Sequence, residues 1–394
     1  MITVDQALAQ IDYLLPNPLE VESVALESAL DRVLRETITS PEDQPPNNRS
    51  SIDGYLVHPG QTPGKVRLLS PHSSALPTPQ LPPLGSAVRI LTGSSLPSNS
   101  ALVMQEDTSA AESGFIQILK QPDVGLVRPK GSHSKKGDTL LTSPSLLQPG
   151  SISLLASLGI TQPKVTRRPR IAHLATGAEL IDPTQSPVDG ETRDSNSILI
   201  RSLLLSFCTD LVLQKRVGDD RKLLTQSIQQ SLTSHPDILL ISGGSSVGDH
   251  DHTFSVLQNL EFTILFRAVS IRPGKPLILA RKGDALAFGI PGNPLSHFVC
   301  FHLFVRRAIL RLLGLSPSPF LQATLLPGPT IKTDSRETWW PCRLANRISN
   351  FTASPLPWRD SSDLSCLAHA NGLLRIPAGQ EARSPCEVLP TISW

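Results

Sequence analysis

The sequence is poor in aromatic side chains and almost balanced in charge. Its 394 residues include two Tyr and four Trp, and the formal net charge is +2. Binding of nucleic acid needs a basic surface, and binding of single strands also needs aromatic side chains interleaved with the basic ones. Neither feature is present, so we expect no nucleic-acid partner.

Cysteine and long apolar runs are also scarce. The five cysteines are widely spaced and form no CxxC pair, which excludes a recognisable zinc site or disulfide framework and favours reduced, mostly buried thiols. No run approaches the roughly 18 apolar residues of a membrane span. Residues 1–15 carry Asp5 early and lack the basic start and apolar block of a signal peptide. We therefore expect a cytoplasmic protein without membrane contact, in which any metal is a hard cation held by carboxylates.

The chain is longer than one hydrophobic core usually supports, so several domains are expected. Apolar residues at helical spacing predict two short helices within residues 3–34, the first capped by Thr3. Short apolar runs separated by Pro, Gly and Ser between residues 55 and 150 predict a small β-rich domain.

From Arg170 onward, strand-like and helix-like segments alternate. This alternation predicts a doubly wound parallel sheet with helices on both faces, closed by a long helix that ends at Gly314. The remaining residues hold all four Trp and many Pro, and their short apolar runs predict a small C-terminal β-barrel-like domain. The predicted division is an N-terminal helical and linker domain (1–44 with 142–169), a β-rich domain (45–141), the α/β domain (170–315) and the C-terminal domain (316–394).

The strongest local pattern is DILLISGGSSVGDHDHT, residues 237–253, in which an apolar strand runs into a Gly-rich turn. Glycines allow close backbone approach to a ligand, and the free amides of such a turn can bind phosphate. Asp249 and Asp251 follow at once, and two carboxylates beside a phosphate cradle are suited to holding Mg²⁺ or another divalent cation. Taken alone, the segment could equally be a plain turn. The candidate residues for phosphate are Ser242, Gly243, Gly244 and Ser246.

A second pattern is SIRPGKPL, residues 270–277, where Arg272 and Lys275 flank a Pro-Gly kink. Two cations on one side of a rigid loop suit an oxyanion. A turn with solvated charges is nearly as plausible from the residues alone.

A third pattern is GIPGNPLSH, residues 289–297, a rigid turn that leads into the long helix. Its amides offer an anion site at a helix N-terminus, with candidate residues Pro291, Asn293 and Pro294. Ser296 is interpreted either as the helix cap or as an anion ligand, and capping is the simpler reading.

Two further segments, ATGAEL (175–180) and DGETRDSN (189–196), follow a strand or open a helix in the same domain. Loops at the carboxyl ends of parallel strands converge where ligands bind. Glu179 and Asp194 are therefore candidates for one cleft, although Asp194 is also a good helix cap.

These motifs, in this order, resemble the MoeA and gephyrin E-domain family of molybdenum cofactor assembly enzymes. The resemblance extends over nearly the whole chain. Beyond the motifs above, it is carried by PPNNRSSIDGYLV (45–57), RILTGSSLP (89–97), VRPKGSHSKKGDTLL (127–141) and DLSCLAHANGLLRIP (363–377).

The resemblance implies a four-domain homodimer whose α/β domain is a MogA-like molybdopterin-binding domain. Such enzymes take adenylylated molybdopterin and molybdate, release AMP with the help of a divalent cation, and yield Mo-molybdopterin; the molybdopterin adenylyltransferase is a possible partner. By the same resemblance, Asp249 and Asp251 handle the metal and pyrophosphate, and Asp53 and Thr92 reach in from the partner subunit. The nucleotide cleft is assigned to Glu179, Ser242, Gly243 and Gly244, and molybdate to Arg272, Lys275 and Ser296.

The sequence departs from the family pattern at several of these motifs. His133 stands in place of an acid, Ala178 in place of Asp, and Arg49 in place of Asn. Arg272 replaces a Lys, which keeps the charge but changes its geometry from a point to a planar fork. Pro341 stands near the usual place of an arginine, with Arg343 two residues on. Two alternatives stay open: a catalytically weak paralogue, and a dimeric scaffold that binds molybdopterin nucleotide or a partner peptide.

Overall fold

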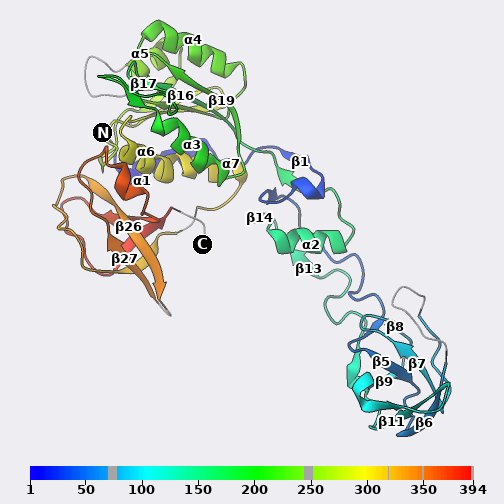
Figure 1. Ribbon diagram of the computed structural model, residues 1–394. Helices are drawn as coiled ribbons and strands as arrows, with labels where there is room; N and C mark the ends of the chain where they lie inside the picture. Colours follow the sequence, from blue (N-terminus) through cyan, green and yellow to red (C-terminus); the bar gives the residue numbers. More distant parts are fainter. Residues whose placement is uncertain (70–77, 244–251, 318, 348–349, 392–394) are drawn as a thin grey trace. The chain divides into compact units, whose positions relative to one another are not determined.

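The computed structural model describes residues 1–69, 78–243, 252–317, 319–347 and 350–391. Internal contacts divide the chain into two compact units (Figure 1). Unit 1 comprises Met1–Arg35, Pro144–Ile152 and Gln162–Trp394, and unit 2 comprises Glu36–Ser143 and Ser153–Thr161. Within the described residues, no helix is long and apolar enough to cross a membrane.

A six-stranded sheet forms the centre of unit 1, in the strand order β19-β16-β20-β24-β23-β21. The first four strands are parallel, and β23 and β21 pair antiparallel on one side. The strand bounds are β16 Arg170–Thr176, β19 Asp210–Val217, β20 Ile238–Ser242, β21 Thr263–Phe266, β23 Ile278–Lys282 and β24 Ala285–Ile290. The predicted doubly wound sheet is confirmed.

Helices cover both faces of this sheet (Figure 1). On one face lie α4 (Arg221–Leu232) and α5 (His252–Asn259), and the other face carries the remaining helices. These are α1 Val4–Leu14, α3 Ser195–Leu205 and the continuous segment α6 Pro294–Cys300, π-helix η4 Phe301–Val305 and α7 Arg306–Leu313. The long helix predicted to end at Gly314 is confirmed: Gly314 is its left-handed cap, with φ 81°.

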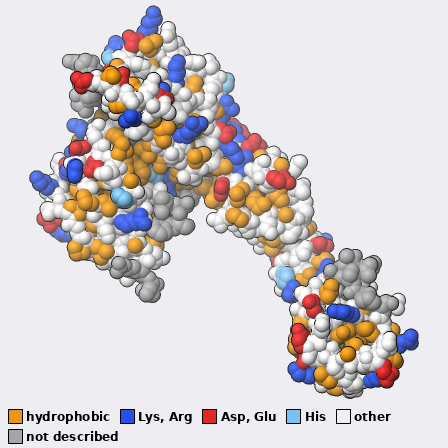
Figure 2. Space-filling view, in the orientation of Figure 1, with side chains coloured by type: hydrophobic (Ala, Val, Ile, Leu, Met, Phe, Trp, Pro, Cys, Tyr) orange, Lys and Arg blue, Asp and Glu red, His pale blue; other side chains and the backbone are white. Residues whose placement is uncertain are grey.

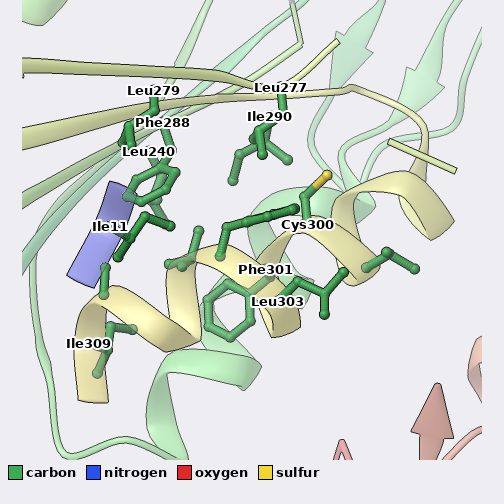
Figure 3. Packing of buried hydrophobic residues seen from close by; sticks show 14 of the residues in the cluster. Ile11, Leu240, Leu277, Leu279, Phe288, Ile290, Cys300, Phe301, Leu303 and Ile309 are labelled. Atoms are coloured by element: carbon green, nitrogen blue, oxygen red, sulfur yellow. The ribbon is translucent and has the colours of Figure 1, made fainter. Parts of the chain in front are cut away.

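The main core lies between the sheet and the segment from α6 to α7 (Figure 3). Leu240 and Phe288 of the sheet pack toward Phe301 and Ile309 of the helical segment, and Ile11 of α1 joins them. All five side chains are fully buried. Burying such a side chain stabilises the fold by about 1.5–3 kcal/mol, so this core fixes the sheet firmly beneath its loops.

The N-terminal segment of unit 1 matches the prediction only in part. Helix α1 begins after Thr3, which accepts from the Gln6 N–H at 3.1 Å while the Gln6 side chain accepts from Thr3 N–H at 3.0 Å. The second predicted helix is wrong. Asp31 has φ 60°, outside the helical region, and Val33–Leu34 is a buried strand. The elements here are β1 Val21–Ser23, the 3₁₀ turn η1 Leu26–Ser28, β2 Val33–Leu34, β14 Ser145–Leu146 and β15 Lys164–Thr166.

A second six-stranded sheet of unit 1 holds the C-terminal residues, with order β22-β26-β27-β25-β29-β28. Its strand β22 (Ile271–Arg272) belongs to the loop with the Pro-Gly kink and pairs in parallel with β26 (Glu337–Arg347). The other elements are β25 Leu321–Leu325, β27 Asn350–Pro355, α8 Leu364–Leu367, β28 Gly372–Ile376 and β29 Cys386–Pro390. The predicted C-terminal β domain is thus present, and its pairing with β22 ties it to the α/β domain.

Unit 2 is built from β-strands, as predicted for this part of the chain. Its largest sheet has the order β10-β11-β6-β7-β5-β9, and smaller sheets pair β12-β4-β8 and β13-β3. The bounds are β3 Ile38–Thr39, β4 Asn48–Ser50, β5 Gly54–Val57, β6 Gly64–Leu68, β7 Ser86–Ile90, β8 Ser95–Leu96, β9 Ala101–Met104, β10 Thr108–Ala110, β11 Phe115–Ile118, β12 Val127–Arg128 and β13 Thr139–Leu141. The remaining elements of the chain are η2 Gln105–Asp107, η3 Val124–Leu126, α2 Pro149–Ser157, β17 Leu180–Ile181 and β18 Thr192–Arg193.

The surface and the thiols agree with the composition. On the visible face, Lys and Arg side chains are interspersed with Asp and Glu over each unit (Figure 2). All five cysteines are free, and all but Cys208 are buried. The expectation of mostly buried thiols is confirmed.

Candidate active site

The loops at the carboxyl ends of the parallel strands border an open cavity of about 1110 Å³ in unit 1. Strands β16, β20 and β24 end at Thr176, Ser242 and Ile290, so the segments that follow them meet at one edge of the sheet. The cavity is lined by seven of the residues predicted from the sequence, namely Glu179, Asp194, Ser242, Gly243, Pro291, Asn293 and Pro294. These residues come from four segments, 175–180, 189–196, 237–253 and 289–297, whose predicted convergence is therefore observed.

Gly243 occupies a position that only glycine fits. Its φ is +91°, and a Cβ there would lie 2.4 Å from the backbone oxygen of Thr176. Its N–H donates to the Ile290 carbonyl at 3.0 Å, which joins the ends of β20 and β24. Gly243 is thus packed against both neighbouring strands. Gly244, Ser246, Asp249 and Asp251, on which the phosphate and metal predictions also depend, lie outside the described residues.

Asp194 is the cap of α3 and also forms part of the cavity wall. It is 2% exposed, and its carboxylate accepts from the Ser197 N–H at 2.9 Å and from the Ser197 hydroxyl at 2.6 Å. Both interpretations of Asp194 are therefore correct at once. With its oxygens engaged by Ser197, this carboxylate shapes the wall and orients α3.

Asn196 is a wall residue that the sequence did not single out. Its amide nitrogen donates to the Gly292 carbonyl at 2.6 Å, and its amide oxygen is buried with no hydrogen-bond partner within the described residues. Asn293, the next residue after Gly292, is held in turn by its amide nitrogen, which donates to Ser361 Oγ at 2.7 Å. Asn196 therefore ties α3 to the turn before α6, and its amide oxygen is a buried acceptor without a partner within the described residues.

The helix that opens beside the cavity begins one turn earlier than a Ser296 cap requires. Asn293 is the N-cap residue and Pro294 the first helical residue, while Ser296 lies inside α6 and is 5% exposed. Proline fits the first helical position because its missing N–H has no partner there. The capping interpretation of Ser296 is wrong, and Ser296 is absent from the residues that line the cavity.

The predicted cations Arg272 and Lys275 lie beside the cavity, which their loop reaches through Pro276. The guanidinium of Arg272 donates to Asp334 at 3.4 Å and lies over the Trp358 ring, 5.4 Å from its centroid. Gly274 allows the turn, with φ +111° and a Cβ position only 2.6 Å from Cys300 Sγ. The loop is therefore held rigidly, as the Pro-Gly kink predicted.

Asp334 and Arg336 are partners of this loop that sequence reasoning missed. Arg336 donates to Asp334 from its backbone N–H, at 2.9 Å, and from its guanidinium. These hydrogen bonds hold the pKa of Asp334 at about 2, so its negative charge is retained at any working pH and stays opposite Arg272. Arg343, considered from the sequence, is exposed and donates to the His369 carbonyl at 3.5 Å.

The described residues contain no group of three or more His, Cys, Asp or Glu side chains able to hold a metal ion. The cavity wall does include the carboxylates of Glu179 and Asp219, which are the oxygen donors that a hard cation prefers. The metal prediction rests on Asp249 and Asp251 and stays a prediction.

In unit 2, Asp53 and Thr92 are hydrogen-bonded to one another. One carboxylate oxygen of Asp53 accepts from the Thr92 backbone N–H at 2.6 Å and from the Thr92 hydroxyl at 2.8 Å. These bonds lower the pKa of the exposed Asp53 carboxyl. Arg49 donates to the Gly93 carbonyl at 2.9 Å, next to this pair, and His133 is exposed. The two motifs predicted to act together are therefore adjacent in the fold.

The fold and the cavity define a multidomain protein built around a molybdopterin-binding α/β domain. The chain matches the MoeA N-terminal region (domain I and II) over residues 2–159, the probable molybdopterin binding domain over 172–311 and the MoeA C-terminal region (domain IV) over 325–393. It belongs to the molybdopterin molybdenumtransferase (MoeA) family.

Comparison with individual proteins gives the same family. The chain is 30% identical over 370 residues to the molybdopterin molybdenumtransferase of Staphylococcus aureus (strain Mu50 / ATCC 700699), covering 91% of this chain and 87% of the relative. It is 32% identical over 318 residues to that of Haemophilus influenzae, covering 80% and 78% of the two chains. The crystal structure of the molybdopterin biosynthesis moea protein from Pyrococcus horikosii aligns with a TM-score of 0.80 at 26% identity over 100% of both chains.

Proposed function

We propose that this protein is a molybdopterin molybdotransferase, which inserts molybdate into adenylylated molybdopterin and releases AMP. The observation that carries this proposal is the polar cavity at the carboxyl edge of the parallel strands, in a chain of this family. Four of the segments that line it contain residues whose chemistry suits a ligand, namely Glu179, Asp194, Ser242 and Asn293.

The cavity suits a nucleotide-linked ligand in size and in chemistry. Its volume of about 1110 Å³ lies just above the usual range for small-molecule sites, which leaves room for a large ligand. Its wall includes Ser242, Asn196 and the backbone of Gly243 at the end of β20. These groups can contact phosphate and pterin oxygens and nitrogens from several sides.

Molybdate, the anion that is transferred, binds beside this cavity in our proposal. Arg272 and Lys275 lie on the loop that reaches the cavity at Pro276. Asp334 faces Arg272 across 3.4 Å and so limits the positive charge that an incoming dianion meets. Lys275 has no ion pair within the described residues, so the loop offers one countered and one uncountered cation, which suits reversible binding of molybdate as a substrate.

We also propose that the reaction uses a divalent cation, with Mg²⁺ as the first candidate. Asp249 and Asp251 would hold it next to the Gly-rich turn. The cation would neutralise charge on the phosphates as the AMP linkage breaks.

The proposal also includes a homodimer in which Asp53 and Thr92 of one subunit complete the cavity of the other. Delivery of the substrate by the molybdopterin adenylyltransferase would follow from the adenylylated form of the substrate. A pure scaffold is less well supported, because a scaffold needs neither a polar cavity nor cations held at its rim.

The test is AMP release under anaerobic conditions. Purified protein, adenylylated molybdopterin, molybdate and Mg²⁺ should release AMP in many turnovers or, if product stays bound, in one equivalent per site. Binding of the nucleotide without AMP release would support the weak paralogue instead. Absence of both binding and release would contradict the proposal.

A further inference from the structure

A chain of hydrogen bonds runs through the buried side of the cavity floor and ends at Ser242. His173 Nε2 lies 2.6 Å from Ser242 Oγ, and His173 Nδ1 lies 3.1 Å from the amide nitrogen of Gln214. The same amide nitrogen donates to the Ser197 carbonyl at 2.9 Å. His173 is 0% exposed and Ser242 is 2% exposed.

The sheet register brings these three side chains together. His173 of β16 pairs with Gln214 of β19 on one side and with Leu240 of β20 on the other. Ser242 stands two residues beyond Leu240, and residues two apart in a strand lie on the same face. His173 therefore bridges β19 and β20 on the face covered by α3 and α6.

The direction of each hydrogen bond in the series Ser197–Gln214–His173–Ser242 follows from the acceptor at its start. The Ser197 carbonyl can only accept, so the Gln214 side chain must turn its nitrogen, not its oxygen, toward it. The second hydrogen of that nitrogen points at His173 Nδ1, which must then carry a lone pair. Burial lowers the pKa of His173 to about 3, so the ring is neutral and its one hydrogen is on Nε2.

Ser242 is consequently an acceptor toward His173. The Nε2–H of the imidazole occupies a lone pair of Ser242 Oγ, and the hydroxyl hydrogen has to point elsewhere. In the part of the chain that the structure describes, His173 is the hydrogen-bond partner found for this oxygen. Ser242 lines the cavity, so the direction left for its hydrogen includes the space where the ligand binds.

We propose that His173 and Gln214 are positioning residues that fix the Ser242 hydroxyl as a hydrogen-bond donor to an oxygen of the bound substrate. This inference rests on the proposed function for the identity of the substrate, whose phosphate and pterin carbonyl oxygens are such acceptors. The same geometry excludes Ser242 as a nucleophile activated by His173. An imidazole that donates to a hydroxyl has no free lone pair with which to remove the hydroxyl proton.

Nitrogen NMR tests the tautomer without any ligand. In protein labelled with ¹⁵N-histidine, His173 should show a protonated Nε2 and an unprotonated Nδ1, unchanged between pH 5 and 8. The resonances are assigned by their disappearance in His173→Gln. A protonated Nδ1, or titration within that pH range, would overturn the proposal.

Substitutions test the consequence for binding. Ser242→Ala and His173→Leu should each weaken binding of adenylylated molybdopterin, measured anaerobically without molybdate, by about five- to tenfold, as expected for one hydrogen bond. The double variant should lose no more than either single one, because both remove the same donor. His173→Gln should recover most of the affinity, since its amide nitrogen can occupy the place of Nε2.

Gln214→Glu provides the sharpest variant, because it leaves Ser242 and His173 in place. A carboxylate at this position accepts from Nδ1–H, and where the ¹⁵N spectrum shows the ring still neutral, its one hydrogen has left Nε2. The Ser242 hydroxyl should then donate to Nε2 instead of to the ligand. We expect a loss of affinity similar to that of Ser242→Ala, together with a protonated Nδ1 in the NMR spectrum.

The outcomes separate this inference from the proposed function. Wild-type protein that fails to bind adenylylated molybdopterin contradicts the proposed function, and the NMR experiment still decides the tautomer. Wild-type protein that binds it while folded His173→Leu binds equally well contradicts the inference alone. A His173→Gln variant no better than His173→Leu would also contradict it, since a merely structural role for the ring predicts no rescue.

Discussion

One carboxylate oxygen of Asp53 accepts two hydrogen bonds from Thr92, although 39 residues separate them in the sequence. The bonds fix the rotamer of the aspartate and leave its other oxygen uncommitted within the described residues. They also lower the pKa of the carboxyl, so it is ionised at neutral pH. A fixed, exposed carboxylate costs little entropy when it contacts a partner, which is the role proposed for it in the homodimer.

Mixing two inactive variants tests the shared site. Asp53→Ala and Asp251→Asn should each be inactive as homodimers, and a mixed dimer should carry one cavity with both lesions and one with neither. After full subunit exchange at equal amounts, roughly a quarter of wild-type sites should return, as follows for a two-fold assembly. Activity is measured alongside the mass of the mixed dimers. Mixed dimers that form and remain inactive would place Asp53 outside the partner's cavity.

Loss of a carboxylate from the Gly-rich loop should slow turnover more than it weakens binding. Charge on the phosphates develops mainly in the transition state, so Asp251→Asn should reduce AMP release by about two to three orders of magnitude. Chelation of divalent cations should reproduce the defect in the wild type. Asp284→Asn is the matched control, because Asp284 is exposed in the turn between β23 and β24. Equal rates of AMP release for Asp251→Asn and the control would refute the metal assignment.

Lys275→Ala should change the response to molybdate and leave the nucleotide unaffected. A charge-assisted contact contributes about 1.5–3 kcal/mol, so the molybdate concentration for half-maximal activity should rise about tenfold or more. The control is Lys222→Ala, which removes an exposed lysine from α4 on the opposite face of the sheet. If affinity for adenylylated molybdopterin falls instead, the loop binds the nucleotide, and the assignment of Lys275 to molybdate is wrong.

Three buried histidines should make the stability of unit 1 depend on pH. Burial lowers the pKa of His173 to about 3, of His297 to about 4 and of His302 to about 3. The unfolded chain, with pKa values near 6.5, binds more protons than the folded chain below that pH. Stability is therefore retained above pH 6.5 and lost as the pH falls toward 4, by up to about 1.4 kcal/mol per pH unit for each histidine.

Urea unfolding at pH 7.5, 6.5 and 5.5 measures this slope. His302→Leu should reduce it, because one of the three groups no longer takes up a proton on unfolding. A free energy of unfolding that does not change between pH 7.5 and 5.5, or a slope unaffected by His302→Leu, would contradict the prediction.

The parts of the site that lie at strand ends could be predicted from the sequence. Glu179, Ser242 and Asn293 follow or close apolar strands, and parallel strands place such residues at one edge of the sheet. Gly243 could be predicted because a close backbone approach demands glycine, and Thr176 indeed lies against it.

The parts that depend on register or on irregular backbone could not be predicted. His173 reads as an ordinary core position within RIAHLAT, and its contact with Gln214 exists only through the pairing of β16 with β19. Asp334 and Arg336 stand in a stretch without periodicity just before β26. The prediction of a second N-terminal helix is wrong because Val33 and Leu34 pair in a sheet, which overrides their helical spacing.

The most direct test of the account is the anaerobic activation of an apo-molybdoenzyme. The protein is incubated with adenylylated molybdopterin, molybdate and Mg²⁺, and the mixture is added to the apoenzyme. The account predicts activation that requires all three components and one AMP released per molybdenum incorporated. AMP release without activation, or activation that proceeds equally well without this protein at the same molybdate concentration, would contradict it.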